Sequence, residues 1–141
     1  MAQEIVEFKV NSHTYYIPQK LENIVSDLSN NFSDCNINIK QLCLKHDISY
    51  THLYEEFLTY LKITPSTFLD YLRLKFFISL IDEKEISIFE LSSKAGFKHP
   101  RTFRNVFRRH MGICPCQCRD YIIQNNDKET QLKKLTQKIF C

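Results

Sequence analysis

Arginine and asparagine side chains recur at helical spacing in the segment that follows Pro100. Arg101, Arg104, Asn105 and Arg108 fall at i, i+3, i+4 and i+7, so one face of a helix would carry all four. Arginine donates two hydrogen bonds to guanine O6 and N7, and asparagine pairs in a similar way with adenine. We therefore predict that Arg101, Arg104 and Asn105 read base edges in the major groove of DNA.

The opposite face of this segment is mostly apolar and consists of Phe103, Val106, Phe107 and His110. Pro100 suits the first position of the helix, because a backbone N–H at that position would make no hydrogen bond within the helix. A shorter helix should precede it and end in the turn Ala95-Gly96-Phe97, with inward residues Ile88, Leu91 and Ser92. Residues 86–120 thus predict a helix-turn-helix unit whose second helix carries arginines outward, an arrangement that suits the major groove.

Basic residues surround the predicted base readers. No acidic residue occurs from Leu91 to Arg119, whereas seven positions are Lys or Arg. A merely solvated helix face rarely has so one-sided a charge, and such a patch is typical of a nucleic-acid surface. We expect phosphate contacts, which give affinity rather than sequence information, from Lys98, His99, Thr102, Arg108 and Arg109.

An earlier segment repeats this organisation. Residues 37–57 and 86–107 share the order of short helix, turn and longer helix. In the earlier copy the helices are predicted at residues 39–46, with Asn38 as N-cap, and 50–61. Its outward positions include Thr51, Tyr54 and Glu55, which are the candidate base contacts of this copy. The carboxylate of Glu55 can accept a hydrogen bond from cytosine N4. Phosphates repel carboxylates, however, so this copy either reads bases, positions the second copy or presents a protein-binding face.

The remaining segments supply the expected frame. Residues 65–81 are apolar on most sides, which predicts a buried helix that joins the two units. Side chains alternate between two faces along residues 4–10, and residues 13–17 form a second β-rich run, so a β-hairpin with a turn at Asn11-Ser12 is predicted. A helix should cover residues 21–30, and residues 132–140 suggest a terminal amphipathic helix. We expect a mainly α fold of three parts: a β-rich arm (1–19), a tandem helix-turn-helix domain (20–120) and a helical tail (121–141).

Composition supports this interpretation. The 141 residues include 43% hydrophobic residues but two Gly and four Pro, which favours helices with short connections. No stretch has the roughly 18–20 apolar residues that a membrane helix needs. The N-terminal sequence lacks the pattern of a secretory signal, so a cytoplasmic protein with reduced cysteines, and no contact with membranes, is expected.

Three of the six cysteines form the pattern C-x-C-x-C at Cys114, Cys116 and Cys118. This spacing differs from that of structural zinc sites, so the three are weak candidates for metal or redox chemistry, and no metal or cofactor is predicted. Cys114, Cys116 and Cys141 are expected at the surface, where Arg109 and Arg119 could lower a thiol pKa. Cys43 and Cys118 are interpreted as small buried residues. The sequence also lacks a phosphate loop and the common hydrolase patterns, which argues against an enzyme.

The tandem units and the connecting helix resemble the DNA-binding domain of the AraC/XylS family of bacterial transcription regulators over about residues 20–120. The matching positions are Gly96-Phe97, Phe103, Phe107, Gly112, Pro115 and Arg119, together with Arg73 in the connecting helix. The resemblance implies that two recognition helices enter successive major grooves on one DNA face, and that the regulator acts by contacting RNA polymerase.

Two departures from the family pattern shape the expectations. Lys62 stands where the family usually has Gly, and only about twenty residues precede the matching part, too few for an effector-sensing domain. A stand-alone member without a small-molecule effector is therefore expected, with an N-terminal arm that packs on its own domain or pairs with a second copy in a homodimer.

The function predicted from the sequence is sequence-specific binding of double-stranded DNA by a bacterial transcription regulator. Activation is favoured over repression, and the second helix-turn-helix unit is the main base reader. The alternative is a protein-interaction module that binds a regulator or RNA polymerase and has weak or no specific DNA affinity. A thiol-based sensor is a third and lesser hypothesis.

Overall fold

The structure is a computed structural model that describes residues 4–10 and 13–140. A hairpin of β1 (Ile5–Val10) and β2 (His13–Pro18) precedes α1 (Gln19–Asn31), α2 (Ile39–Lys45), α3 (Tyr50–Leu61) and α4 (Pro65–Ser79). The chain continues through α5 (Ile88–Lys94), α6 (Pro100–Met111), α7 (Pro115–Asn125) and α8 (Lys128–Phe140). The predicted mainly α fold is confirmed. The predicted turn at Asn11-Ser12 and the terminal Cys141 lie outside the described residues.

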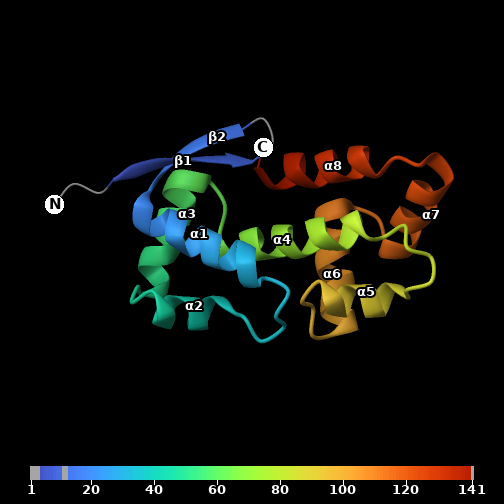
Figure 1. Cartoon of the computed structure of the whole chain (residues 1–141), viewed down its shortest axis with the longest axis horizontal. Helices are drawn as coiled ribbons and strands as arrows, with labels where there is room; N and C mark the ends of the chain where they lie inside the picture. The colour runs from blue at the N-terminus through green and yellow to red at the C-terminus, as the bar shows by residue number, and fades with distance from the viewer. Residues whose placement is uncertain (1–3, 11–12, 141) are drawn as a thin grey trace.

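Two helix-turn-helix units stand at the two ends of α4 (Figure 1). The first unit consists of α2 and α3, and the second of α5 and α6. Short polar side chains begin three of these helices: Asn38 accepts from the N–H of Gln41, Ser49 from that of His52, and Ser87 from that of Glu90. The predicted N-cap at Asn38 and the predicted span of residues 50–61 are both confirmed.

Helix α4 is the buried connection that its composition predicts. Phe68, Leu74, Phe77 and Ile78 are at most 1% exposed, and the helix ends at Ser79, two residues before the predicted end. Aromatic rings join it to its neighbours: the ring of Phe68 lies 5.8 Å from that of Phe57 on α3, and the ring of Phe77 lies 4.7 Å from that of Phe103 on α6. The core therefore runs continuously from α3 to α6.

The hairpin and α8 lie together along one side of α4 (Figure 1). Phe140 on α8 packs edge-on against Tyr71 of α4 with ring centroids 4.9 Å apart, and it also lies 6.1 Å from the ring of Tyr15 on β2. Lys128 donates to the carbonyl of Ser79 at 2.8 Å and pairs with Asp82 at 2.9 Å, which fixes the start of α8. The hairpin thus packs on its own domain through one face, and the C-terminal segment is a docked helix.

Two arginines hold the loops that lead into the two units. Arg73 of α4 donates to the carbonyls of Phe32, Asp34 and Ile37 at 2.9–3.2 Å. Arg119 of α7 donates to the carbonyls of Ile81, Glu83 and Ile86 at 2.6–3.0 Å. Each of these carbonyls lies 49 residues after the corresponding acceptor of Arg73. The same fork of donors therefore fastens the loop before α2 and the loop before α5, so the repeat extends to these contacts.

Three details depart from the sequence-based expectations. Ile88 and His110, predicted to face inward, are only half-buried, and Met111 is the fully buried residue at the end of α6. The predicted start of the tail at residue 121 falls within α7, which continues to Asn125 because Ile122 is still buried against the core.

Candidate DNA-binding surface

The exposed face of α6 carries the predicted base readers. Arg101, Arg104, Asn105 and Arg108 are all exposed, as are the predicted phosphate-binding residues Lys98, His99, Thr102 and Arg109. The guanidinium carbon of Arg104 lies 5.7 Å from the centroid of the Phe89 ring on α5, a cation–π contact that restricts where this side chain can point. The structure thus brings these residues together on one helix and the turn before it.

The buried face of α6 fixes the orientation of the arginines. Phe103 and Phe107 are fully buried and pack on Phe77 of α4 at 4.7 and 5.6 Å between ring centroids. At the C-terminal end of the helix, Arg109 and His110 both approach Oδ2 of Asp70 on α4, at 3.2 and 3.4 Å. Asp70 therefore offsets part of the charge of Arg109.

On α3 the corresponding face is nearly uncharged. Thr51, Tyr54 and Glu55 are exposed, and α3 contains neither Lys nor Arg. Glu56 is different from Glu55: its side chain is 12% exposed and pairs with His52 at 3.0 Å. Of the two carboxylates that the sequence places near this face, only Glu55 therefore points outward.

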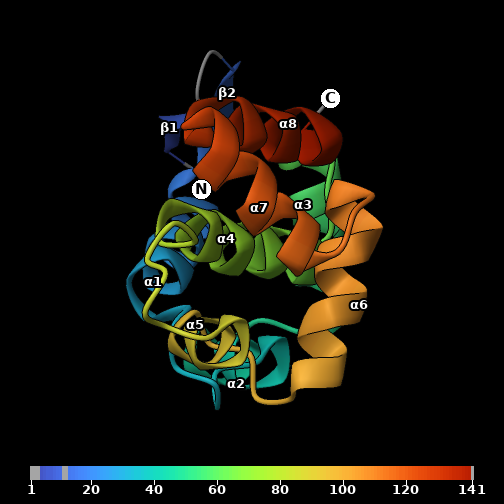
Figure 2. The ribbon, with the colours of Figure 1, turned by 90° about the vertical axis from the view of Figure 1, so that its right-hand side faces the viewer.

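A glycine of the second unit packs against α4 and the loop that leads into the first unit. Gly96, in the turn of the second unit, has φ +105°, and a Cβ atom there would lie 2.8 Å from Nε of Arg73 and 3.1 Å from Cα of Ser33. The guanidinium of Arg73 also lies 5.8 Å from the ring centroid of Phe97. The loop before the first unit thus packs directly on the turn of the second, which fixes how α3 and α6 are placed relative to each other (Figure 2).

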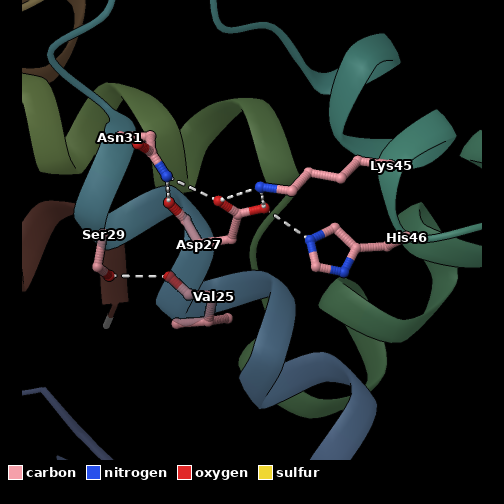
Figure 3. A network of polar contacts seen from close by, with 6 residues as sticks. All are labelled: Val25, Asp27, Ser29, Asn31, Lys45 and His46. Atoms are coloured by element: carbon pink, nitrogen blue, oxygen red, sulfur yellow. Dashed lines mark hydrogen bonds and ion pairs between the residues drawn. The ribbon is translucent and has the colours of Figure 1, made fainter.

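A polar network fixes α1 to the first unit (Figure 3). The Asp27 carboxylate receives hydrogen bonds from His46 at 2.7 Å, from Lys45 at 3.1 Å and from Asn31 at 2.7 Å. Burial of the carboxyl group raises its pKa, but these hydrogen bonds lower it by more, so the pKa of Asp27 lies below its ordinary value. The network joins the end of α2 to the body of the domain.

The three cysteines of the C-x-C-x-C segment differ in their exposure. Cys116 is exposed, Cys114 is half-buried, and Cys118 is fully buried with its thiol pKa raised by desolvation to about 11. Arg109 and Arg119 are held by Asp70 and by backbone carbonyls. Within the described part of the chain, no group of three or more His, Cys, Asp or Glu side chains could hold a metal ion. Cys43 is buried, and its pKa is also raised by burial.

Some residues that shape this surface were missed by sequence reasoning. Asp70 and Asp27 act as anion partners for side chains 39–40 and 18–19 residues away in sequence. Local periodicity carries no signal for such contacts. Phe89, which supports Arg104 from the start of α5, is exposed, and the signal available in the sequence was a large aromatic residue at an outward helix position.

Together the fold and the exposed basic helix define a tandem helix-turn-helix domain. The helix-turn-helix domain family matches residues 42–121, which is more than half of the chain. The chain therefore belongs to the AraC-type family of helix-turn-helix domains. None of the helices in residues 4–10 and 13–140 is long and apolar enough to cross a membrane.

Similar proteins span a range of lengths. The chain is 25% identical over 111 residues to histidine kinase P4 of Formosa agariphila, covering 79% of the chain and 8% of the kinase. It is 24% identical over 110 residues to the lactose operon transcription activator of Staphylococcus xylosus, covering 78% of the chain and 39% of the activator. The structure superposes on the DNA-binding domain of the global transcriptional factor AdpA, solved with a target DNA, with a TM-score of 0.67, 20% identity and 76% and 96% coverage. The chain thus spans well under half the length of both relatives.

Proposed function

We propose that this domain binds double-stranded DNA sequence-specifically and that α6 is its main base reader. Arg101, Arg104 and Asn105 discriminate bases, while Lys98, His99, Thr102, Arg108 and Arg109 contact phosphates. The observation that carries this proposal is the exposed face of α6, which has four arginines, one asparagine and no acidic residue on a rigidly packed helix. Arginine and asparagine are suited to guanine and adenine, and the remaining cations release counterions from the backbone.

We further propose that Thr51, Tyr54 and Glu55 contact a second half-site. Two helices on one rigid body reach two major grooves on one DNA face when the grooves lie about one turn, roughly 34 Å, apart. The continuous aromatic core and the contact at Gly96 support such rigidity.

Activation of transcription is the regulatory outcome that we propose, through contact with RNA polymerase. The resemblance to the lactose operon transcription activator supports this direction. A homodimer would use the outer face of the hairpin, where Ile5 is 53% and Tyr16 is 65% exposed. A reporter gene that carries the selected site tests the sign of regulation, and light scattering tests the oligomeric state.

The experiment that tests the proposed function is selection of binding sites from a random duplex library with the purified protein. Two enriched half-sites about one turn apart are expected, with the more strongly enriched one lost in Arg101→Ala/Arg104→Ala. The matched control is Lys84→Ala, an exposed cation in the loop before α5 and outside the proposed surface.

Binding without enrichment would instead favour the protein-interaction module. The exposed aromatic residues of α3 support that candidate: Tyr50 is 53% and Tyr54 is 37% exposed, and their rings lie 6.1 Å apart. In that case Arg101→Ala/Arg104→Ala would leave binding to the protein partner intact.

A further inference from the structure

The outward face of α3 differs in chemistry from the matching face of α6. Thr51, Tyr54 and Glu55 occupy the positions that Arg101, Arg104 and Asn105 occupy fifty residues later (51 to 101, 54 to 104 and 55 to 105). Each helix starts one residue before the first of these positions, at Tyr50 or Pro100, and each is followed by a left-handed residue, Lys62 or Gly112. The same geometry therefore presents a methyl group, an aromatic ring and a carboxylate in place of cationic and amide donors.

Each of these three groups matches a pyrimidine. The threonine methyl and an aromatic ring make apolar contact with the C5 methyl of thymine, whereas a carboxylate accepts a hydrogen bond from cytosine N4. Purines offer the N7 acceptor in the major groove, and guanine adds O6; neither a methyl group nor a carboxylate can donate to these atoms. Adenine also offers its N6 amino group to a carboxylate, and the base preference of Glu55→Gln separates that contact from one to cytosine N4. Only Glu55 is available for such a contact, because Glu56 is turned inward and paired with His52 at 3.0 Å.

The surroundings hold these groups in place. Ser49 caps the N-terminus of α3, and Leu53 and Phe57 on the opposite face are fully buried. The ring of Tyr54 packs beside that of Tyr50 with an interplanar angle of 35°. Within the described residues, Glu55 has no hydrogen bond or ion pair, so its carboxylate is free to accept from a base.

We infer that α3 reads a pyrimidine-rich strand through thymine methyl groups and a cytosine amino group, while α6 reads purine edges. This inference rests on the proposed function. It also assigns different energetic roles to the two units: α3 has no Lys or Arg and supplies sequence selectivity with little salt dependence, whereas α6 supplies most of the salt-dependent affinity.

Replacement of thymine by uracil tests the methyl contact, because it removes one methyl group and leaves the base pair intact. In the half-site read by α3, each contacted thymine should lose about fourfold in affinity when it becomes uracil, from about 0.8 kcal/mol per buried methyl. Tyr54→Ala should abolish that loss at one position, and Tyr54→Phe should preserve it. The same replacement in flanking DNA should have no effect.

A change of base preference tests the carboxylate contact. Glu55→Gln converts an acceptor for cytosine into an amide that suits adenine, so one position of the half-site should change preference from cytosine to adenine by about fivefold or more. Tyr54 and Glu55 are exposed, so thermal unfolding of each variant should match that of the native chain and exclude misfolding as a cause.

The possible failures are distinguishable. Equal affinity for thymine and uracil sites, together with an unchanged preference in Glu55→Gln, would overturn the inference even if Arg104→Ala still loses its own half-site. A purine-rich strand facing α3 would also overturn it. If no sequence is enriched by the native chain, the proposed function fails first, and the inference fails with it.

Discussion

Arg73 and Gly96 are in closer contact than any side chain at position 96 would permit. The Nε atom of Arg73 lies 2.8 Å from the point where a Cβ atom on Gly96 would be, and the carbonyl oxygen of Phe32 is closer still. Arg73 reaches this point because it donates to that same carbonyl from α4. The contact links the loop of the first unit, the connecting helix and the turn of the second unit, so the relative placement of α3 and α6 depends on it.

Gly96→Ala should destabilise the domain more than Gly112→Ala. Both glycines have positive φ, which costs an L-residue about 1 kcal/mol or more, but nothing lies within 4 Å of a Cβ on Gly112. We expect a loss of about 1 kcal/mol in the free energy of unfolding for Gly112→Ala and about 3 kcal/mol or more for Gly96→Ala. Urea denaturation of both variants measures this difference, and equal losses would mean that the close approach is not maintained in solution.

Lys62→Gly should stabilise the chain. Lys62 ends α3 with φ +65°, at the position where Gly112 ends α6. Relief of the left-handed strain should outweigh the greater entropy of glycine in the unfolded chain and the loss of the 2.9 Å bond from Lys62 to Thr59, for a net gain of about 0.5–1 kcal/mol. Lys62→Ala keeps the Cβ atom and should give no gain. A melting temperature that rises equally in both variants would refute this explanation.

Asp27→Asn should cost stability at neutral pH and much less in acid. The pKa of Asp27 is lowered in the folded state, so its carboxylate stabilises the fold above the unfolded pKa of about 3.9, and this contribution disappears as the pH falls through the lower folded value. We expect a loss of about 1–2 kcal/mol at pH 7, because hydrogen bonds to a charged group are weakened. The gap from the native chain should narrow below about pH 4.

Asp47→Asn is the control for this pH dependence. Asp47 is exposed in the turn of the first unit and makes no ion pair in the described residues, and asparagine tolerates its φ of +51°. The free energy of unfolding of the Asp47→Asn variant should equal that of the native chain at every pH. An Asp27→Asn deficit that is as large at pH 3 as at pH 7 would show that the carboxylate is not the stabilising group.

Thiol labelling of the native protein should separate the cysteines by burial. Cys35 and Cys116 are exposed and should react at pH 8, whereas Cys118 should stay unmodified because it is fully buried with a pKa of about 11. Cys43 should also be protected, since burial raises its pKa. Mass spectrometry after brief alkylation identifies the modified peptides, and denatured protein provides the full-labelling control. Rapid modification of Cys118 would revive the redox hypothesis for the C-x-C-x-C segment.

The fold was largely predictable because hydrophobic periodicity is a local signal. The period of Phe103, Val106 and Phe107 alone places the inner face of α6, and the capping side chains of Asn38 and Ser49 fix where two helices start. The docking of α8 was not predictable. Its apolar residues lie among lysines, and only the three-dimensional structure shows that Phe140 meets Tyr71.

The candidate site was predictable to the same extent. Exposure of Arg101, Arg104 and Asn105 follows from the helical period, but the ion pair that draws Arg109 toward Asp70 spans 39 residues of sequence. The inward turn of Glu56 likewise depends on its partner His52 and on the packing of α3.

The most direct test of the central claim compares Arg104→Ala with Arg108→Ala on the selected site across a salt series. If α6 reads bases, Arg104→Ala should lose about 1–3 kcal/mol of discrimination against a substituted guanine at one position, which Arg108→Ala retains. Arg108→Ala should instead weaken binding to all sequences and reduce the slope of log affinity against log salt by about 1. Uniform weakening by both variants, with no base position affected, would contradict the assignment of α6 as the reader.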